Sequence, residues 1–252
     1  MAIDILRMPA YRGASLRPWG PWASLGWAAL AQAAGLAAVA ACAWVLAQSN
    51  PNLFDYQFLF RSGDPLGSSL LILSYVVLVA TLCIAIRRAG WDVALYLALV
   101  KPRGRYVIYA IVWTVLSLLL TFAHSTQFDV SQFLHPHGYD HARLMNGLLI
   151  HFVAVVIAAP LMEEILFRGF LYRGLSESRI GVVGAIILTS LIWTFMHDSK
   201  SAAGMIDTAL HGVAWGWLRW YTGSLWTPIA CHVAYNGTIS GLAIARLYGW
   251  FG

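Results

Sequence analysis

Charged side chains are scarce in this sequence. Only 11% of its 252 residues are Asp, Glu, Lys or Arg, whereas 60% are hydrophobic, and the mean hydropathy is +0.68. Because soluble domains carry about 25% charged residues, a deficit spread along the whole chain indicates an integral membrane protein with little room for a soluble domain. The net charge is +5, but the basic residues form no stripe with interleaved aromatics, so nucleic acid is not an expected partner.

Cysteines are few, and the signatures of several membrane proteases are missing. Cys42, Cys83 and Cys231 lie in apolar runs without metal-ligand spacing, so we interpret them as small buried hydrophobic residues. The His-Glu-x-x-His zinc motif and the Gly-x-Gly-Asp motif of aspartyl intramembrane proteases do not occur. Any catalytic site must therefore use another set of polar residues.

Seven apolar stretches are long enough to cross a bilayer, since a transmembrane helix needs about 20 apolar residues. They cover about residues 24–47, 68–88, 106–124, 147–172, 181–197, 204–221 and 225–248. The first is interpreted as a retained span rather than a cleaved signal peptide, because its apolar run starts late. We therefore predict an all-α fold, a polytopic transmembrane helix bundle of about seven spans with a polar site in its interior.

One integral membrane domain with two parts is expected. Residues 1–144 would hold an N-terminal cytosolic tail and the first three transmembrane helices, and residues 145–252 a core of four transmembrane helices, which carries the motifs described below. With the N-terminus inside, eleven Lys and Arg residues fall in cytoplasmic segments and four in outer segments. Because basic residues concentrate in cytoplasmic loops, we expect a cytoplasmic N-terminus, in the inner (cell) membrane of a bacterium.

The stretch PLMEEILFRGFLY, residues 160–172, places ionisable side chains inside a predicted span. A charge at the centre of a span costs about 2.5–3.5 kcal/mol, so such residues mark functional sites by default. Glu164 and Arg168 are four residues apart and share one helix face, whereas Glu163 is rotated by about 100° from Glu164. We interpret Glu164 and Arg168 as a structural pair and Glu163 as the glutamate available for chemistry.

Two further spans bring histidine and amide side chains. His232 and Asn236, in CHVAYN, share one face of the last span, and His197 closes the fifth span in LIWTFMHD. A desolvated glutamate can act as a general base on water, and imidazole and amide N–H groups can donate to an oxyanion. Together with Glu163, these residue types are sufficient for a hydrolytic site.

These motifs resemble the CPBP family of intramembrane proteases, the CAAX-processing and bacteriocin-processing (Abi) proteins that include the ras-converting enzyme. The resemblance rests on Glu163-Glu164-x-x-x-Arg168, on a histidine after the next span and on His232-x-x-x-Asn236, and FRGFLY and TGSLWTPIACHVAYN support it. It covers about residues 145–240. One departure is Trp193, which stands where the family usually has Phe, four residues before the histidine.

The resemblance implies a glutamate-type endopeptidase without a cofactor. Glu163 and His197 would activate water, His232 and Asn236 would stabilise the tetrahedral oxyanion, and Glu164 and Arg168 would hold the site together. The expected substrate is a peptide or protein tail presented at the lipid bilayer, near its cytoplasmic side. The sequence identifies neither a prenylated substrate nor an oligomeric state.

The remaining polar residues of the predicted core have less defined roles. Asp207 and His211 are four residues apart, and we interpret them as a hydrogen-bonded pair, although His211, like Trp193, is also a candidate for the substrate cavity. Gly212 and Gly216 are interpreted as a helix-packing pair. One inconsistency concerns depth: at about 1.5 Å per residue, His197 lies about 24 Å from the cytoplasmic end of its span, against about 10–16 Å for the other site residues.

Two alternatives stay open. Glu163, His197 and His232 have the ligand types of a catalytic zinc site with water in the fourth position. A protein without protease activity is the other alternative: an immunity or scaffold factor, or a proton-coupled carrier, since buried Glu, Asp and His also build proton relays. The sequence shows no inverted repeat and no pair of broken helices, which argues against the carrier.

Overall fold

The computed structural model describes residues 17–49, 64–125, 146–197 and 202–250, and within these ranges it contains helices and no strand. The predicted all-α fold is thereby confirmed. Residues 1–16 of the predicted tail and the predicted domain boundary after residue 144 lie outside the described residues.

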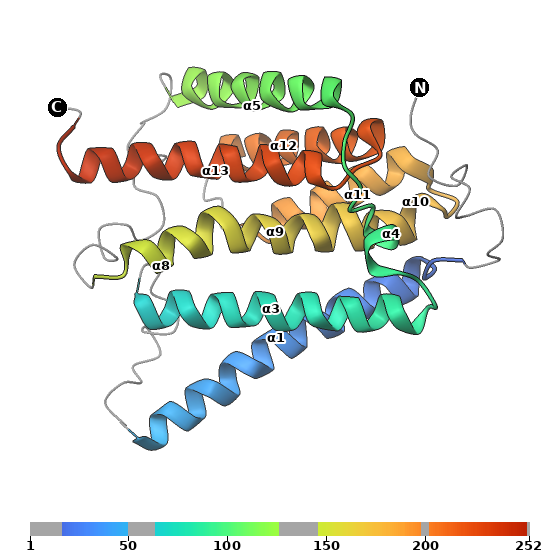
Figure 1. The fold of residues 1–252 in the computed structure, drawn as a ribbon, viewed down its shortest axis with the longest axis horizontal. Helices are drawn as coiled ribbons and strands as arrows, with labels where there is room; N and C mark the ends of the chain where they lie inside the picture. The colour runs from blue at the N-terminus through green and yellow to red at the C-terminus, as the bar shows by residue number, and fades with distance from the viewer. Residues whose placement is uncertain (1–16, 50–63, 126–145, 198–201, 251–252) are drawn as a thin grey trace.

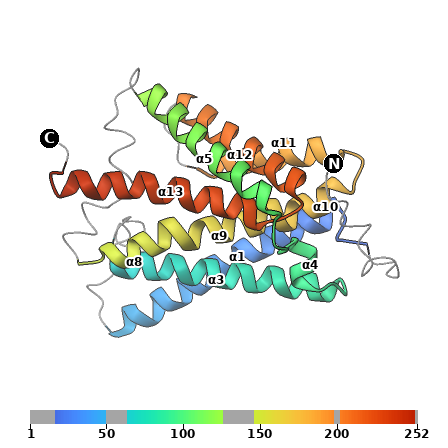
Figure 2. The same cartoon turned by 45° about the horizontal axis from the view of Figure 1, so that its top comes forward.

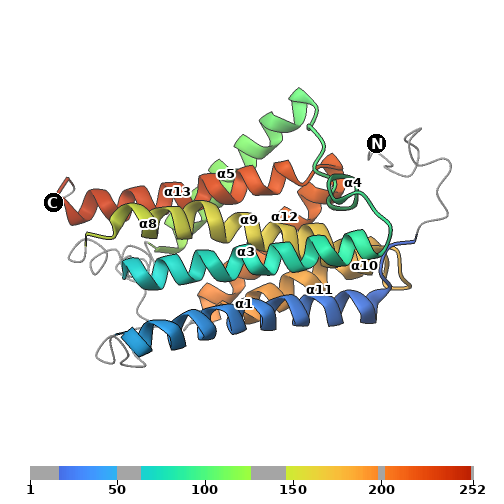
Figure 3. The same ribbon diagram turned by 60° about the horizontal axis from the view of Figure 1, so that its bottom comes forward.

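The long helices lie side by side as a bundle (Figure 1). Their bounds are α1 Pro21–Ser49, α3 Pro65–Arg88, α5 Gly104–Ser125, α11 Gly181–Phe195, α12 Ala202–Thr222 and α13 Trp226–Leu247. A short helix, α4 Val93–Leu97, joins α3 to α5. Figure 2 shows α5 lying across α12 and α13, and Figure 3 shows α1 running along α3.

A continuous helix from Leu148 to Ser176 lies between α3 and α13 in Figure 1. It is divided by its hydrogen-bond register into α8 Leu148–Phe152, η4 Val153–Ala158, α9 Ala159–Glu163, η5 Glu164–Leu171 and α10 Tyr172–Ser176. The two η segments are π-helical, with hydrogen bonds that reach back five residues instead of four. Such π-helical turns are frequent at functional sites, and both glutamates lie at the boundary between α9 and η5.

Three of these helices are long and apolar enough to cross a membrane: Pro21–Gln48, Pro65–Arg88 and Leu148–Ser176. Gly104–Leu119 and Gly181–Phe195 are shorter apolar helices. A described helix coincides with each of the seven predicted spans, but the count of seven spans stays a prediction. Large hydrophobic side chains are exposed along α5 and α11, for example Ile108, Val183 and Phe195, as expected for an integral membrane protein.

Local sequence signals account for the ends of α3. The carboxylate of Asp64 accepts from the backbone N–H groups of Leu66 and Gly67, at 2.8 and 3.1 Å, and Pro65 occupies the first turn. Arg87 and Arg88 lie in the last turn, where they complement the negative end of the helix dipole. The physical chemistry of capping therefore places this helix where the hydropathy pattern predicts it.

The predicted packing role of Gly212 and Gly216 is confirmed. A Cβ atom added to Gly212 would lie 2.9 Å from Cβ of Ser190, and one added to Gly216 would lie 2.9 Å from Cγ2 of Ile186. Helices α11 and α12 therefore approach as closely as small residues allow. The buried hydroxyl of Ser190 donates to the carbonyl of Ile186, one turn earlier on its own helix, at 2.7 Å, so this close contact leaves that hydroxyl satisfied.

Candidate functional site

Glu164 lies at the centre of a sealed polar cluster. Its side chain has no exposed surface, and its Oε1 atom accepts hydrogen bonds from Arg168 Nη1 at 3.2 Å and from His232 Nδ1 at 3.0 Å. A buried charge is tolerated when it is paired and hydrogen-bonded. The structural pair of Glu164 and Arg168 that the sequence predicts is therefore present.

Arg168 connects three helices through its guanidinium group. Besides Glu164 on its own helix, it donates from Nη2 to the backbone carbonyl of Gly212 on α12 at 3.2 Å. Its Cζ atom lies 4.8 Å from the ring centroid of Trp193 on α11 and 5.7 Å from that of Trp215 on α12, distances at which a cation is attracted to an aromatic face. The fully buried cation thus holds η5, α11 and α12 together.

Glu163 has a different environment from its neighbour. Its side chain is 16% exposed, and its Oε2 atom accepts a hydrogen bond from the indole Nε1 of Trp193 at 2.6 Å. The same oxygen lies 4.0 Å from Nε2 of His232. Among the described contacts Glu163 forms no ion pair with an arginine, and part of its surface is open, in contrast to Glu164.

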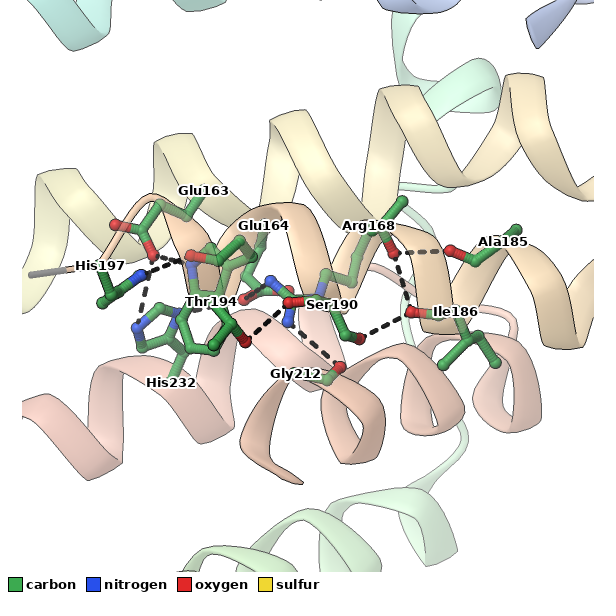
Figure 4. Close-up of polar contacts among 12 residues, drawn as sticks. Glu163, Glu164, Arg168, Ala185, Ile186, Ser190, Thr194, His197, Gly212 and His232 are labelled. Atoms are coloured by element: carbon green, nitrogen blue, oxygen red, sulfur yellow. Dashed lines mark hydrogen bonds and ion pairs between the residues drawn. The ribbon is translucent and has the colours of Figure 1, made fainter. Parts of the chain in front are cut away.

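His232 lies between the two glutamates (Figure 4). Its Nδ1 faces the Glu164 carboxylate, which can only accept, so we assign the hydrogen to Nδ1 and leave Nε2 facing Glu163. The indole ring of Trp215 stacks on the imidazole, with centroids 4.1 Å apart and planes at 29°. The ring is thus held in one orientation by a hydrogen bond on its edge and an aromatic contact on its face.

His197 lies just beyond the end of α11. The helix ends at Phe195, and the backbone N–H of His197 donates to the carbonyl of Thr194 in a tight turn. Its imidazole Nδ1 contacts the carbonyl of Trp193 at 2.8 Å, and the two rings lie 4.4 Å apart. Figure 4 shows His197 beside Glu163, and its side chain is exposed.

The depth inconsistency comes from counting along isolated helices. The count ended the glutamate helix at residue 172, whereas the described helix continues to Ser176, so Glu163 lies about 20 Å from its end at 1.5 Å per residue. The side chain of Trp193 reaches Glu163, and its ring lies 5.8 Å from that of His232. Since His197 packs against the same indole, the structure brings it to the level of the other site residues.

Asn236 follows His232 by one helical turn on α13, and its side chain is partly buried. Its amide Nδ2 donates to the backbone carbonyl of Val155, in the π-helical segment η4, at 3.0 Å. One of its two N–H groups is therefore occupied, and the other is available to a ligand. The structure places both residues of the His-x-x-x-Asn motif against the helix that carries the glutamates.

Asp207 and His211 form the predicted pair. Nδ1 of His211 lies 2.8 Å from the backbone carbonyl of Asp207 and 3.5 Å from its carboxylate. The His211 ring packs against Tyr235 and Trp215, with centroids 4.6 and 5.5 Å away. A role of His211 or Trp193 in a substrate cavity stays a prediction, although Trp193 is now seen to contact Glu163 directly.

Two residues of the site were not identified from the sequence. Trp215 stacks on His232 and lies near Arg168, and the carbonyl of Gly212 accepts from Arg168. Trp215 is four residues after His211, so helical spacing indicates a shared face. No sequence signal identifies the Gly212 carbonyl, because every residue has one.

No cluster of three or more His, Cys, Asp or Glu side chains suited to a metal ion occurs in the described part of the chain. The zinc alternative requires Glu163, His197 and His232 around one ion. The described residues give the zinc alternative no support, and the zinc site stays an untested prediction.

One family model matches the part of the chain that contains the candidate site. Residues 145–238 match the family model described as type II CAAX prenyl endopeptidase Rce1-like. No curated protein and no solved structure matches the chain. The matched range contains every candidate site residue from Glu163 to Asn236, and it supports a CAAX-type intramembrane protease in general. Over these residues the chain is similar to the type II CAAX prenyl endopeptidase Rce1-like family, the same family that its motifs resemble.

Proposed function

We propose that the protein is an intramembrane endopeptidase in which Glu163 activates water to hydrolyse a peptide bond. The observation that carries this proposal is the difference between the two adjacent glutamates. Glu164 is sealed and neutralised by Arg168, while Glu163 keeps an exposed surface and faces Nε2 of His232. A partly desolvated carboxylate that can reach water is the arrangement that a general base needs.

In the proposed reaction, the oxygen of a water molecule attacks the carbonyl carbon while Glu163 takes one of its protons. The negative charge develops on the former carbonyl oxygen. Glu163 then passes the proton to the leaving nitrogen, the C–N bond breaks, and a free carboxyl group and a free amine remain. This chemistry needs no cofactor, because one carboxylate carries the proton in both steps.

His232 and Asn236 would stabilise the oxyanion. Nε2 of His232 lies on the side that faces Glu163, and in the doubly protonated imidazolium it would carry a second N–H that donates to the developing charge. The second N–H of the Asn236 amide would add a neutral donor. His197, which is exposed and packs on the same indole that binds Glu163, would orient the water from the opposite side.

The substrate class follows from the family and from the fold. Both glutamates lie on the helix Leu148–Ser176, which is apolar and long enough to cross a membrane, so we propose a membrane-presented peptide or protein tail as substrate. We also propose the orientation inferred from the basic residues, with the N-terminus in the cytoplasm of a bacterial cell and cleavage near the cytoplasmic side. The distribution of Lys and Arg supports this orientation.

The test is peptide-bond cleavage by the purified protein in nanodiscs, with a library of membrane-anchored peptides. Wild type is compared with Glu163→Gln and with Glu177→Gln, which removes a partly exposed carboxylate that pairs with Arg173 at 2.9 Å. We expect Glu163→Gln alone to abolish cleavage, with a chelator having no effect. Full activity in Glu163→Gln would refute the proposal, and loss on chelation with recovery on zinc would replace it by the metal-dependent version.

A further inference from the structure

The helix that carries the glutamates has a backbone defect one turn before them. At the end of η4, the backbone N–H of Ala159 donates to the carbonyl of Ala154, five residues back. In the same register, the carbonyl of Val155 would accept a hydrogen bond from the backbone N–H of residue 160. Residue 160 is proline, which has no N–H. The π register and the proline together deprive Val155 of its backbone donor.

A side chain from another helix supplies the missing donor. The Asn236 amide donates to this same carbonyl of Val155 at 3.0 Å. The two helices also touch at the next position, since a Cβ atom added to Gly237 would lie 3.5 Å from Cγ1 of Val156. In an apolar environment an unsatisfied carbonyl is strongly unfavourable, so this contact has a clear physical reason to persist.

The position of this contact links it to the reacting groups. Asn236 lies one turn after His232 on α13, and His232 contacts Glu164 and faces Glu163. Helix α13 is thus joined to the glutamate helix at two points, one at the carboxylates and one at Val155. Two contacts on antiparallel helices fix the rotation and the axial position of α13, which a single contact cannot do.

We propose that Asn236 is a positioning residue, whose amide completes the helical turn left open by Pro160 and thereby holds His232 opposite Glu163. This inference rests on the proposed function for its catalytic consequence and adds to the role of the second N–H at the oxyanion. The proposal also gives a role to Pro160. Because this residue has no N–H, the Val155 carbonyl can accept the hydrogen bond from Asn236 on α13.

The proposal predicts rescue at a distance. Asn236→Ala leaves Val155 without a donor, whereas the additional change Pro160→Ala provides a backbone N–H at the required place. In the peptidase assay we expect Asn236→Ala to lower kcat with little change in KM, and Pro160→Ala to leave that loss in place, because its N–H satisfies Val155 without joining α13 to the glutamate helix. Rescue by Pro160→Ala is therefore expected in stability and not in kcat.

A second readout does not depend on activity. The thermal unfolding midpoint in detergent is measured for wild type, both single variants and the double variant. We expect Asn236→Ala to lower the midpoint, and to lower it much less when Pro160→Ala is present. Asn236→Leu, which keeps the size without the donor, replaces Asn236→Ala if the latter does not fold. Thr238→Ala is the matched control on α13, because this exposed hydroxyl donates only to the carbonyl of Ala234 in the described contacts.

The two readouts separate the failure of this inference from that of the proposed function. If the two substitutions act additively on the unfolding midpoint, the inference is overturned even if the enzyme is active. If Pro160→Ala restores kcat in the Asn236→Ala background, the positioning role is overturned, because activity then needs only a satisfied Val155 carbonyl and not the contact with α13. If wild type cleaves no peptide, the proposed function fails, and non-additive midpoints still establish the link between Pro160 and Asn236.

Discussion

Two adjacent carboxylates of this protein differ more in environment than in position. Glu164 has no exposed surface and contacts Arg168 and His232, whereas Glu163 is partly exposed and contacts Trp193. The helix turns them onto different faces, so one lies inside the cluster of η5, α11 and α12 and the other at its edge. The comparison teaches that a charge can be structural or reactive according to which face of one helix carries it.

The largest expected effect is the loss of catalysis when Glu163, the partly exposed glutamate, is changed. Glu163→Gln keeps the size of the side chain and its contact with Trp193, but removes the base, so kcat should fall by about 10²–10⁴-fold. The unfolding midpoint should stay close to that of wild type, because the residue is partly exposed. Peptide cleavage and thermal unfolding on the same preparation check both halves, and a large loss of stability would contradict the assignment.

Changes to the buried pair of Glu164 and Arg168 should affect the stability of the fold first. Arg168→Met leaves the buried Glu164 with His232 but without its arginine, and breaking a buried pair in this way costs about 3–5 kcal/mol. The double variant Glu164→Gln with Arg168→Met removes both charges and should recover part of that stability. A double-mutant cycle on the free energy of unfolding measures this, and additive losses would show that the two residues are not energetically coupled.

Trp193 contacts both Glu163 and Arg168. Removing its indole N–H tests the contact with Glu163. Trp193→Phe keeps an aromatic ring but removes the donor to Glu163, so kcat should fall by about tenfold to a hundredfold, the range for a hydrogen bond to a charged group. Trp217→Phe is the control, because Trp217 is exposed and stacks on Tyr221 at 4.9 Å. Equal effects of the two substitutions would refute a specific role of the Glu163 contact.

The smallest expected effect concerns the helix contact behind Arg168. Gly212→Ala would place a methyl group 2.9 Å from Cβ of Ser190, and such overpacking costs about 1–3 kcal/mol. Gly241→Ala on α13 has open space around its Cβ position and should be neutral or slightly stabilising. Thermal unfolding compares the two variants, and an equal result would mean that α11 and α12 adjust without cost.

Much of the site follows from helical spacing. The spacing of four residues predicts the Glu164–Arg168 pair, the Asp207–His211 pair and the shared face of His232 and Asn236, and the structure contains all three arrangements. These predictions succeed because side chains four residues apart on a helix are neighbours whatever surrounds them.

Contacts between helices are less predictable. The expected depth of His197 relative to Glu163 was misleading, because the glutamate helix continues to Ser176, beyond the end expected at residue 172. The stacking of Trp215 on His232 and the hydrogen bond from Trp193 to Glu163 depend on how three helices pack. No rule of spacing within one segment contains that information.

The sequence by itself determined that the chain is helical and rich in apolar segments, and that its polar residues gather in the last four predicted spans. It also separated the two glutamates, since an angle of about 100° between neighbouring residues is a property of any helix. Only the tertiary structure decided which partners each one meets: Arg168 and His232 for Glu164, Trp193 for Glu163 and the Val155 carbonyl for Asn236. The physical reason is that hydropathy and helical period act within a segment, whereas the packing of side chains and the need to satisfy every buried polar atom act between segments.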